Sequence, residues 1–288
     1  MKHKMEKAIK KSEVLIEALP YIKRFFGKVV VIKHGGSTLA DKKITKGILE
    51  DIVFMSYAGM RPVLIHGGGP NINRAMKKAG KKVKFVNGQR ITDRETVHIV
   101  DKALSEVNRE LAQGIKKLGG RTYGLSGRDS GLIIARKIRS DIDLGFVGEV
   151  AKVDTTLLDR LLDANIIPVV SPVGRGTDGE LYNINADSSA AKIAAALKAE
   201  KIFTLTNVRG VLKNAKDPQS LFNTLRPKDV KRLIKKGIIA GGMIPKVSAC
   251  LLALKGGVKK AHIVSAALPH ALLLEIFTKE GIGTEIAR

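Results

Sequence analysis

Two lysines in this sequence stand beside glycine pairs, where the backbone can approach an anion closely. Lys33 ends the β-branched run 29–32 and precedes Gly35-Gly36, and Lys246 follows Gly241-Gly242 at an expected helix start. A lone lysine before a turn is usually a solvated side chain. Two lysines on separate turns, with glycine N–H groups beside them, suit a phosphoryl group in transit, because its equatorial oxygens carry the negative charge.

A run of three glycines, Gly67-Gly68-Gly69, follows the apolar run 63–65 and precedes a helical pattern. One explanation is a simple tight turn. Three consecutive glycines exceed what a turn requires, and they allow a nest of backbone N–H groups that holds negative charge together with the helix N-terminus. We therefore favour a phosphate or carboxylate site here.

Three polar residues, Asn183, Asn185 and Asp187, lie just before the small-residue stretch 188–197. An asparagine or aspartate at this place could merely cap a helix. Two asparagines and one aspartate within six residues are more than one cap needs. Asn185 and Asp187 are therefore candidate site residues.

Several familiar catalytic signatures are absent from the sequence, among them the G-x-x-x-x-G-K-[ST] loop, the protein-kinase H-R-D and D-F-G sets and the H-E-x-x-H metal motif. The segment 124–127 is one residue short of the G-x-S-x-G elbow of serine hydrolases. The single cysteine, Cys250, lies in an apolar run and is expected to be packed, since one cysteine makes neither an internal disulfide nor a thiolate metal site. We expect a reducing, cytoplasmic setting.

The elements that must position these residues follow one repeated theme, an apolar run, a small-residue turn and a helical pattern. The expected strands are 29–32, 63–65, 166–170, 202–205 and 262–264, and the expected helices include 44–58, 93–118, 185–200 and 245–257. Strands that alternate with helices predict an α/β fold with a mostly parallel sheet covered on both faces. Ligands of such sheets sit beyond the carboxyl ends of the strands, where the glycines of this sequence are found.

The first 26 residues have a different pattern. Apolar residues recur there at helical spacing, and Pro20 should break or kink the helix. One interpretation is a helix packed on its own body, and the other is a protruding helix that pairs with another subunit, since a terminal helix needs docking to be ordered.

The composition is that of a globular protein with a large positive charge. The 288 residues are 44% hydrophobic and 27% charged, and 51 lysines and arginines against 27 acidic residues give a formal net charge of +24. Such a charge attracts polyanions, so nucleic acid must be considered. The excess is spread over at least two regions, 1–28 and 226–260, and aromatic residues are only 4% of the chain with no tryptophan. Diffuse charge favours solubility or attraction of anionic substrates over nucleic-acid binding.

No apolar run approaches the roughly 20 residues that span a bilayer. Glu13 and Glu17 interrupt the stretch that follows the basic start, so a secretory signal is not expected.

Taken together, these segments resemble the amino-acid kinase family, and within it the kinases of N-acetyl-L-glutamate. The resemblance runs from about Gly27 to Thr284. The segments that carry it are VIKHGG (31–36), HGGGP (66–70), NGQRITD (87–93), GLSGRD (124–129), YNINAD (182–187), LTNVRGV (205–211), GMIPK (242–246) and GIGT (281–284). The glycine and lysine segments are shared across the family, whereas 87–93 and 183–187 point to acetylglutamate.

The resemblance implies a three-layer α/β sandwich and one reaction. ATP would give its γ-phosphoryl group to the γ-carboxylate of N-acetyl-L-glutamate, which yields N-acetyl-L-glutamyl 5-phosphate and ADP in the second step of arginine biosynthesis. Residues 1–28 would form an N-terminal helix for oligomerisation, 29–180 the acetylglutamate-binding lobe and 181–288 the ATP-binding lobe.

The resemblance also assigns roles to residues of the transfer site. Lys33 and Lys246 would stabilise the transferring phosphoryl group, and Asp187 would hold the two lysines in position. Arg90 would grip the α-carboxylate of the substrate, a task that suits the fork of a guanidinium group. Asn185 would bind the substrate as well.

The backbone and the nucleotide complete this assignment. Gly68-Gly69 would offer amides to the substrate, and Gly35-Gly36 would offer amides to phosphate oxygens. Asn207, which stands where the family usually has aspartate, and Gly210 would lie at the nucleotide. Magnesium would come with ATP through phosphate oxygens, so no protein-borne metal site is expected.

The N-terminal helix resembles that of the arginine-inhibited members, in which it interlaces dimers into a hexamer. The ending 275–284 resembles their effector site, so feedback inhibition by arginine is expected, although 265–267 departs from the usual Asp-Gly-Arg. His34 is a further departure, since the family usually has tyrosine there.

Two alternatives stay open. The first is another amino-acid kinase, acting on a different carboxylate, a carbamate or a phosphate. The second is a basic nucleic-acid-binding or regulatory protein that keeps the fold without the activity. We expect small-molecule substrates and a homo-oligomer, without a membrane, and nucleic acid is the weaker expectation.

Overall fold

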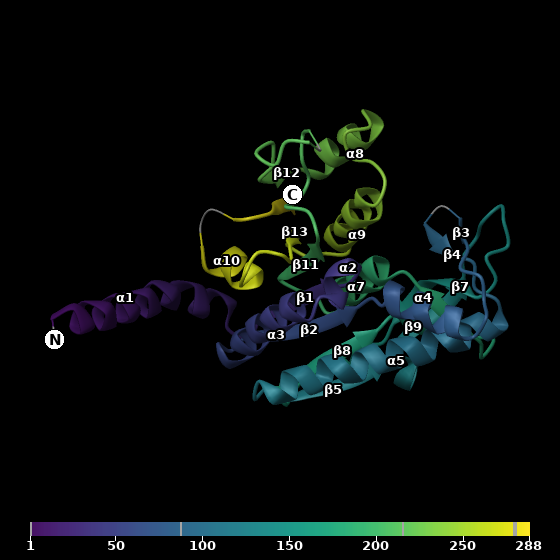
Figure 1. Cartoon of the computed structure of the whole chain (residues 1–288), viewed down its shortest axis with the longest axis horizontal. Helices are drawn as coiled ribbons and strands as arrows, with labels where there is room; N and C mark the ends of the chain where they lie inside the picture. The colour runs from purple at the N-terminus through teal and green to yellow at the C-terminus, as the bar shows by residue number, and fades with distance from the viewer. Residues whose placement is uncertain (1, 87, 215, 279–280) are drawn as a thin grey trace.

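An eight-stranded sheet runs through the centre of the protein (Figure 1). The computed structural model describes residues 2–86, 88–214, 216–278 and 281–288, so Asn87, Lys279 and Glu280 of the sequence motifs lie outside the described residues. The strands, in their order across the sheet, are β12 (Thr224–Leu225), β14 (Thr284–Ala287), β13 (Lys260–Ser265), β11 (Lys201–Thr206), β1 (Val29–His34), β2 (Arg61–His66), β8 (Ile167–Ser171) and β5 (Thr122–Ser126). The pairs are parallel except β13 with β14, so the predicted mostly parallel sheet is confirmed.

Helices cover both faces of the sheet. One layer holds α3 (Lys42–Tyr57), α5 (Arg94–Lys117) and α10 (Ala271–Phe277), and the other holds α6 (Thr156–Asp163), α7 (Ala186–Ala196), α8 (Pro227–Lys235) and α9 (Met243–Lys255). Two further helices, α2 (Ser37–Ala40) and α4 (Gly69–Lys78), follow the turns after β1 and β2. The predicted three-layer α/β sandwich is therefore confirmed.

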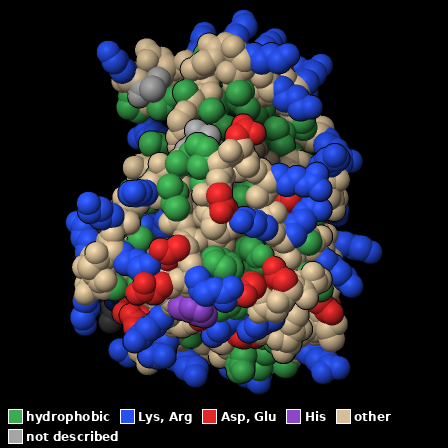
Figure 2. Space-filling view, turned by 90° about the vertical axis from the view of Figure 1, so that its right-hand side faces the viewer, with side chains coloured by type: hydrophobic (Ala, Val, Ile, Leu, Met, Phe, Trp, Pro, Cys, Tyr) green, Lys and Arg blue, Asp and Glu red, His purple; other side chains and the backbone are tan. Residues whose placement is uncertain are grey.

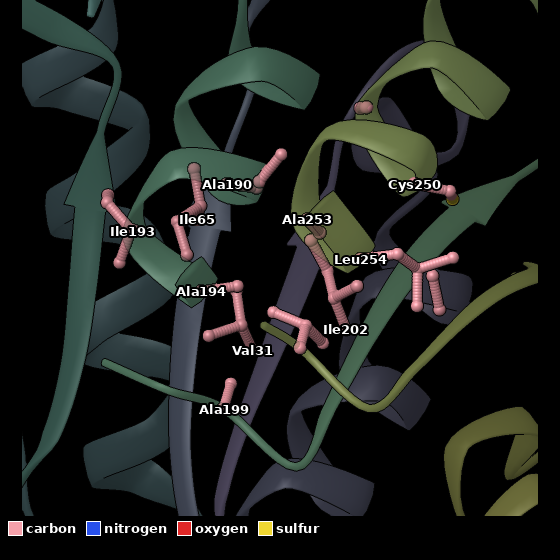
Figure 3. Close-up of a cluster of buried hydrophobic side chains, with 14 of the residues drawn as sticks. Val31, Ile65, Ala190, Ile193, Ala194, Ala199, Ile202, Cys250, Ala253 and Leu254 are labelled. Carbon is pink, nitrogen blue, oxygen red and sulfur yellow. The ribbon is translucent and has the colours of Figure 1, made fainter. Parts of the chain in front are cut away.

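Alternation along β1 explains how one strand serves both layers. Val30 and Ile32 enter the core beneath α3 and α5, whereas Val31 enters the core beneath α7 and α9. Successive side chains of a strand point to opposite faces, so a strand buried on both faces is apolar throughout. Figure 3 shows Val31 among small side chains of α7 and α9, whose alanines allow these two helices to lie close to the sheet and to each other.

A small closed barrel stands beside the main sheet and was not predicted. It consists of β6 (Ile133–Lys137), β7 (Val147–Val153), β9 (Val173–Gly176) and β10 (Leu181–Ile184), and the 3₁₀ turn η1 (Asp129–Gly131) precedes it. A hairpin of two-residue strands, β3 (Phe85–Val86) and β4 (Gln89–Arg90), is separate from both sheets.

The N-terminal helix α1 (Lys2–Phe25) projects from one side of the body (Figure 1). It is anchored at its end, where Phe25 is buried and Tyr21 lies 6.1 Å from the ring of Phe277, while Ile9 and Ile16 are exposed. The interpretation of a helix packed along its own body is therefore wrong for most of its length. The predicted break at Pro20 is also wrong, because the helix continues through this residue. Proline has no N–H to donate to the carbonyl of Ile16, but Ile16 is exposed, so water can bind that carbonyl instead.

Cys250 is fully buried and unpaired, as the sequence predicts. Among the described residues, no helix is long and apolar enough to cross a membrane.

Candidate active site

The two candidate lysines meet at one aspartate. The Nζ atom of Lys33 lies 2.8 Å from Oδ1 of Asp187, and Nζ of Lys246 lies 3.7 Å from Oδ2 of the same carboxylate. Lys33 comes from the carboxyl end of β1, Asp187 from the first turn of α7 and Lys246 from the first turn of α9. Three segments far apart in the sequence thus bring two positive charges and one negative charge to the carboxyl edge of the sheet.

Burial sets the electrostatics of this cluster. Lys33 is 5% exposed and Asp187 is 6% exposed. Burial by itself would raise the pKa of Asp187, but the two ammonium groups outweigh it and hold that pKa below its ordinary value. Burial also lowers the pKa of Lys246, against the attraction of Asp187. The cluster keeps a net positive charge in a site with little water, where an anion interacts strongly.

The two glycine turns touch at the same edge. The N–H of Gly67 donates to the carbonyl of His34 at 2.8 Å, and a Cβ on Gly35 would lie 3.2 Å from Nζ of Lys33 and 3.3 Å from the nitrogen of Gly67. Gly36 has φ +71°, a conformation that glycine adopts without strain. The backbones of the two turns therefore approach each other more closely than side chains would permit.

Within the second turn, two neighbouring glycines have different surroundings. A Cβ on Gly68 would lie 2.5 Å from Cδ2 of Leu104 on α5, whereas a Cβ on Gly69 would meet nothing within 4 Å. Gly68 thus lets α5 pack against the start of α4, whereas the space beside the Cα atom of Gly69 is open.

Arg90 lies on β4 and reaches back to α4. Its Nη2 donates to Oδ1 of Asn73 at 2.6 Å, its Nη1 lies 3.1 Å from Sδ of Met76, and its guanidinium carbon stacks 4.7 Å from the ring centroid of Phe85. The side chain is 6% exposed, and burial lowers its pKa. It forms no ion pair with a described residue, so a fixed, partly desolvated positive charge stands near the start of α4 without an acidic partner.

Asn185 is the N-cap of α7. Its Oδ1 accepts from the backbone N–H groups of Asp187 at 2.9 Å and Ser188 at 3.1 Å. The capping explanation is therefore correct for the oxygen of this side chain. The amide hydrogens on Nδ2 are the part that could bind a ligand. Asn183 donates instead to Oγ1 of Thr92 at 3.3 Å.

Asn207 and Gly210 lie in the loop after β11. Asn207 is exposed and its Oδ1 accepts from Oγ1 of Thr206 at 3.3 Å, while Gly210 packs against Thr284. Among the described residues, no hydrogen bond or ion pair joins either of them to the lysine–aspartate cluster. They occupy the same carboxyl edge of the sheet as Lys33, since β11 is the neighbour of β1.

Sequence reasoning assigned no role to four polar residues that lie near the glycine turns, His34, His66, Thr45 and Asn108. The signal was present in the strand alternation, since Lys33 and His34 must point to opposite faces. Lys33 meets Asp187 on the α7 side, and His34 meets Thr45 on the α3 side, where its Nε2 lies 3.1 Å from Oγ1 of Thr45.

A cavity of about 520 Å³ lies at the amino end of β11, against the C-terminal end of α1. Lys201 begins β11 here, is 7% exposed, forms no ion pair with a described residue and lies over the ring of Phe25 at 5.2 Å. Burial lowers the pKa of Lys201. Like Arg90, Lys201 is thus a buried positive group without an acidic partner among the described residues, and it lines this cavity.

Two carboxylates also line this cavity. Glu275 accepts from Nδ1 of His262 at 2.8 Å and from the N–H of Ile282 at 2.8 Å, and Glu285 accepts from Nζ of Lys260 at 2.7 Å. Burial lowers the pKa of His262, so its ring is neutral near pH 7 and its Nε2 is buried without a hydrogen-bond partner among the described residues. The cavity is thus lined by two carboxylates and by three basic side chains, Arg24, Lys201 and Lys260.

Comparison with known proteins adds a family to this geometry. The model of the amino acid kinase family matches residues 28–265. The acetylglutamate kinase of Caldanaerobacter subterraneus subsp. tengcongensis is 48% identical over 288 residues, a match that covers 100% of this chain and 96% of the relative.

Solved structures show the same architecture. The N-acetylglutamate synthase of Neisseria gonorrhoeae complexed with coenzyme A and N-acetyl-glutamate is similar with a TM-score of 0.85 and 28% identity, and covers 96% of this chain. This chain spans 63% of the length of that structure. The same synthase complexed with coenzyme A and L-arginine gives a TM-score of 0.79 and 27% identity, with 96% of this chain and 65% of the other covered.

Proposed function

This chain belongs to the amino-acid kinase family, and we propose that it is an ATP-dependent acetylglutamate kinase of arginine biosynthesis. It transfers the γ-phosphoryl group of ATP to the γ-carboxylate of N-acetyl-L-glutamate. A γ-carboxylate oxygen forms the new P–O bond, the bond to the β,γ-bridging oxygen breaks, and ADP leaves with that electron pair. The products are N-acetyl-L-glutamyl 5-phosphate and ADP.

The observation that carries this proposal is the Lys33–Asp187–Lys246 cluster. A phosphoryl group in transit spreads its charge over three equatorial oxygens, and catalysis depends on positioning and on electrostatic stabilisation. Lys33 and Lys246 supply the positive charge from two different segments. Asp187 pairs with both, which keeps two ammonium groups close together despite their repulsion.

The acceptor would lie on the β2 and α4 side of the cluster. Arg90, which lacks an acidic partner among the described residues, would bind the α-carboxylate with two parallel N–H donors. The N–H groups of Gly68 and Gly69 would face a carboxylate at the start of α4. The Nδ2 hydrogens of Asn185 would donate to the substrate, since its Oδ1 already caps α7.

The nucleotide would lie on the β11 side. Gly35 and Gly36 would offer backbone N–H groups to phosphate oxygens, and Asn207 and Gly210 would border the nucleotide in the loop after β11. Mg²⁺ would arrive as part of the nucleotide on its phosphate oxygens, where it neutralises charge.

This arrangement supports two lobes, residues 29–180 for acetylglutamate and 181–288 for ATP. The strand order has a seam between β1 and β11: β1, β2, β8 and β5 come from the first lobe, and β11, β13, β14 and β12 come from the second. β10, at the start of the second lobe, pairs with β7 and β9 of the first. The transfer cluster lies at the seam, where both lobes contribute residues.

The test is acceptor specificity. Mg-ATP is supplied with N-acetyl-L-glutamate, L-glutamate, carbamate or no acceptor, and the acyl phosphate is trapped with hydroxylamine while ADP is measured. We expect hydroxamate and ADP in equal amounts with the acetylated acceptor alone. Turnover with another acceptor supports a different amino-acid kinase. Absence of turnover, together with salt-dependent binding of DNA or RNA, supports a binding protein on this fold.

A second proposal concerns the cavity at the start of β11, for which we infer feedback binding of arginine. Lys201 would bind the α-carboxylate, and Glu275 and Glu285 would bind the cationic groups of the ligand. The presence of a buried ammonium group and two carboxylates in one cavity supports this assignment. The cavity lies at the far end of β11 from the transfer cluster, so arginine bound there would act through the fold and not by competition.

An inhibition curve tests the arginine proposal. We expect millimolar arginine to inhibit the wild type, and Lys201→Met to weaken this inhibition by about tenfold or more with the uninhibited kcat unchanged, because a charged hydrogen bond is lost. Lys259→Met is the matched control, since Lys259 is exposed and pairs with Glu200. A flat curve for the wild type, or equal effects of the two substitutions, contradicts the assignment.

A third proposal concerns α1, which would pair with the α1 helix of a second copy. The exposed side chains of Met5, Ile9 and Ile16 lie along one surface of the helix, together with Ser12, Glu13 and Glu17. A helix that projects into solvent with such a surface needs a partner to bury it. The C-terminal end of α1 also lines the cavity proposed to bind arginine, so the same helix would take part in both oligomerisation and regulation.

A further inference from the structure

Two histidines lie side by side beneath the glycine turns. His34 and His66 are paired residues in the register of β1 and β2, and both are 0% exposed. They point to the α3 and α5 side of the sheet, away from the Lys33–Asp187 pair on the α7 side. Neither histidine therefore takes part in the cluster to which the reaction is assigned.

Hydrogen bonds through Thr45 join His34 to α2, which follows the Gly35-Gly36 turn. Oγ1 of Thr45 lies 3.1 Å from Nε2 of His34 and 3.2 Å from the carbonyl oxygen of Leu39 on α2. We assign the one hydrogen of this hydroxyl to the carbonyl of Leu39, so that its oxygen accepts from the Nε2–H of His34. Oγ1 of Thr38, also on α2, donates to the carbonyl of Gly35 at 2.9 Å. The Gly35-Gly36 turn is thus held from both ends.

His66 is fixed by a similar arrangement on the α5 side. Its Nδ1–H donates to the carbonyl of Gly67 at 2.8 Å, and its Nε2 accepts from Nδ2 of Asn108 at 3.1 Å. The N–H of Gly67 in turn donates to the carbonyl of His34 at 2.8 Å. The two turns are therefore coupled through Gly67, whose N–H bonds the backbone of His34 and whose carbonyl bonds the ring of His66.

Packing alone does not account for His34. Its Nδ1 is buried without a hydrogen-bond partner among the described residues, and burial lowers the pKa of the ring to about 3 and that of His66 to about 4. An apolar side chain would fill this space without the cost of desolvating a ring nitrogen. What histidine adds is one directed hydrogen bond, from Nε2–H to Thr45.

We propose that His34 and Thr45 are positioning residues for the phosphoryl transfer. Their hydrogen bond fixes the Gly35-Gly36 turn relative to the Gly67–Gly69 turn and so sets the separation between the phosphate-binding and carboxylate-binding backbones. This inference rests on the proposed function, because it takes those two turns to bind the nucleotide and the acceptor. A small misplacement of reacting groups is costly even when both substrates still bind.

The test compares isosteric and conservative substitutions at both ends of the bond. Thr45→Val and His34→Leu remove it, whereas Thr45→Ser and His34→Gln keep a group that can form it. Thr122→Val is the matched control, because Oγ1 of Thr122 donates to the carbonyl of Ile167 at 2.6 Å in the same sheet, away from both turns. Steady-state kcat, the KM of each substrate and the melting temperature are measured for each variant.

We expect Thr45→Val and His34→Leu to lower kcat about tenfold and to change either KM less than about threefold. The double variant should be no slower than the slower single variant, because the two changes remove the same bond. Thr45→Ser and His34→Gln should retain most of the activity. Thr122→Val should lower the melting temperature and leave kcat unchanged.

Some results overturn this inference and leave the proposed function intact. One is an unchanged kcat in Thr45→Val, and another is a loss of kcat in Thr45→Val and Thr122→Val alike, in proportion to the fall in melting temperature. Equal losses in Thr45→Ser and Thr45→Val also overturn it. Absence of acetylglutamate-dependent turnover in the wild type overturns the proposed function itself, and this inference with it.

Discussion

At the scale of single residues, Asp187 sets the net charge of the site to which phosphoryl transfer is assigned. Two ammonium groups close together repel, and the aspartate that pairs with both reduces the local charge to that of one cation. The remaining positive charge can then stabilise a transferring phosphoryl group. The depressed pKa of Asp187 keeps this carboxylate ionised throughout the neutral range.

Arg90 provides the first prediction. Arg90→Ala removes the charged donor assigned to the substrate α-carboxylate, so the KM for acetylglutamate should rise about 10- to 100-fold, with the KM for ATP changed less than about twofold. Initial-rate kinetics with each substrate varied check this. Arg94→Ala is the control, since Arg94 is a nearby exposed arginine paired with Glu180. Equal changes in the two KM values would remove Arg90 from the acceptor site.

The second prediction separates two neighbouring glycines. Gly68→Ala places a methyl group against the buried Leu104, so it should lower the free energy of unfolding by about 1 to 3 kcal/mol. Gly69→Ala meets open space and should change stability by less than about 0.5 kcal/mol. Urea unfolding of both variants measures the difference. Equal stability of the two would mean that α5 does not pack on Gly68 as described.

At the scale of elements, the central strands could be predicted because they are buried on both faces. β1, β2, β8, β11 and β13 are short β-branched runs, and their apolar residues mark them without any tertiary information. The barrel strands could not be predicted in this way. β9 contains two glycines and an arginine. It is stabilised by pairing with β6, which is distant in the sequence, and with β10, whose residues show no regular apolar pattern.

The same limit applies to the site. Lys33 and Lys246 were identifiable because glycines flank them, but their convergence on Asp187 depends on how α7 and α9 pack on the sheet. The strand alternation marks only the face to which His34 points, and Thr45 carries no local signal. Their contact is fixed by the crossing of α3 over β1, which no local pattern encodes.

The third prediction concerns the start of α5. Hydrogen bonds from Lys81 and Thr96 lower the pKa of Asp93 from 3.8 to about 2. Because the folded pKa is the lower one, the stabilisation is complete above about pH 4 and disappears as the pH falls toward 2. Asp93→Asn keeps the helix cap and loses the charge, so it should cost about 0.5 to 1 kcal/mol at pH 7 for this exposed group and nothing near pH 2.

Urea unfolding of wild type and Asp93→Asn from pH 7 to pH 2 measures this effect. Asp41→Asn is the control, since Asp41 caps α3 through the N–H groups of Lys43 and Ile44 and forms no ion pair with a described residue. A difference for Asp93→Asn that stays constant over the whole pH range would contradict the assignment to its charge.

At the scale of the whole molecule, the fourth prediction concerns the projecting helix α1. Ile9→Glu with Ile16→Glu places charge on the surface assigned to a second copy, so the mass measured by light scattering should fall by a whole number of subunits. Lys7→Gln with Lys11→Gln changes the net charge by the same amount and should leave the mass unchanged. A monomeric wild type, or equal masses for all three proteins, would exclude pairing through α1.

The net charge of +24 is a property of the whole surface. Figure 2 shows lysine and arginine side chains spread over the face in view, with acidic side chains between them, and not gathered into one stripe. A spread of this kind attracts small anions in general and fits a nucleotide substrate better than a track for a nucleic-acid backbone. Nothing in the fold explains why the excess is so large.

The central claim is that Lys33 and Lys246 together stabilise the transferring phosphoryl group. The most direct measurement is the rate of acetylglutamate-dependent ADP release from Mg-ATP in the wild type, Lys33→Met and Lys246→Met, with binding of both substrates measured separately. We predict that each substitution lowers kcat on the order of 10²-fold or more while the protein stays folded and still binds acetylglutamate. A kcat within about twofold of the wild type in either variant would contradict the account, because transition-state stabilisation cannot be lost without a loss of rate.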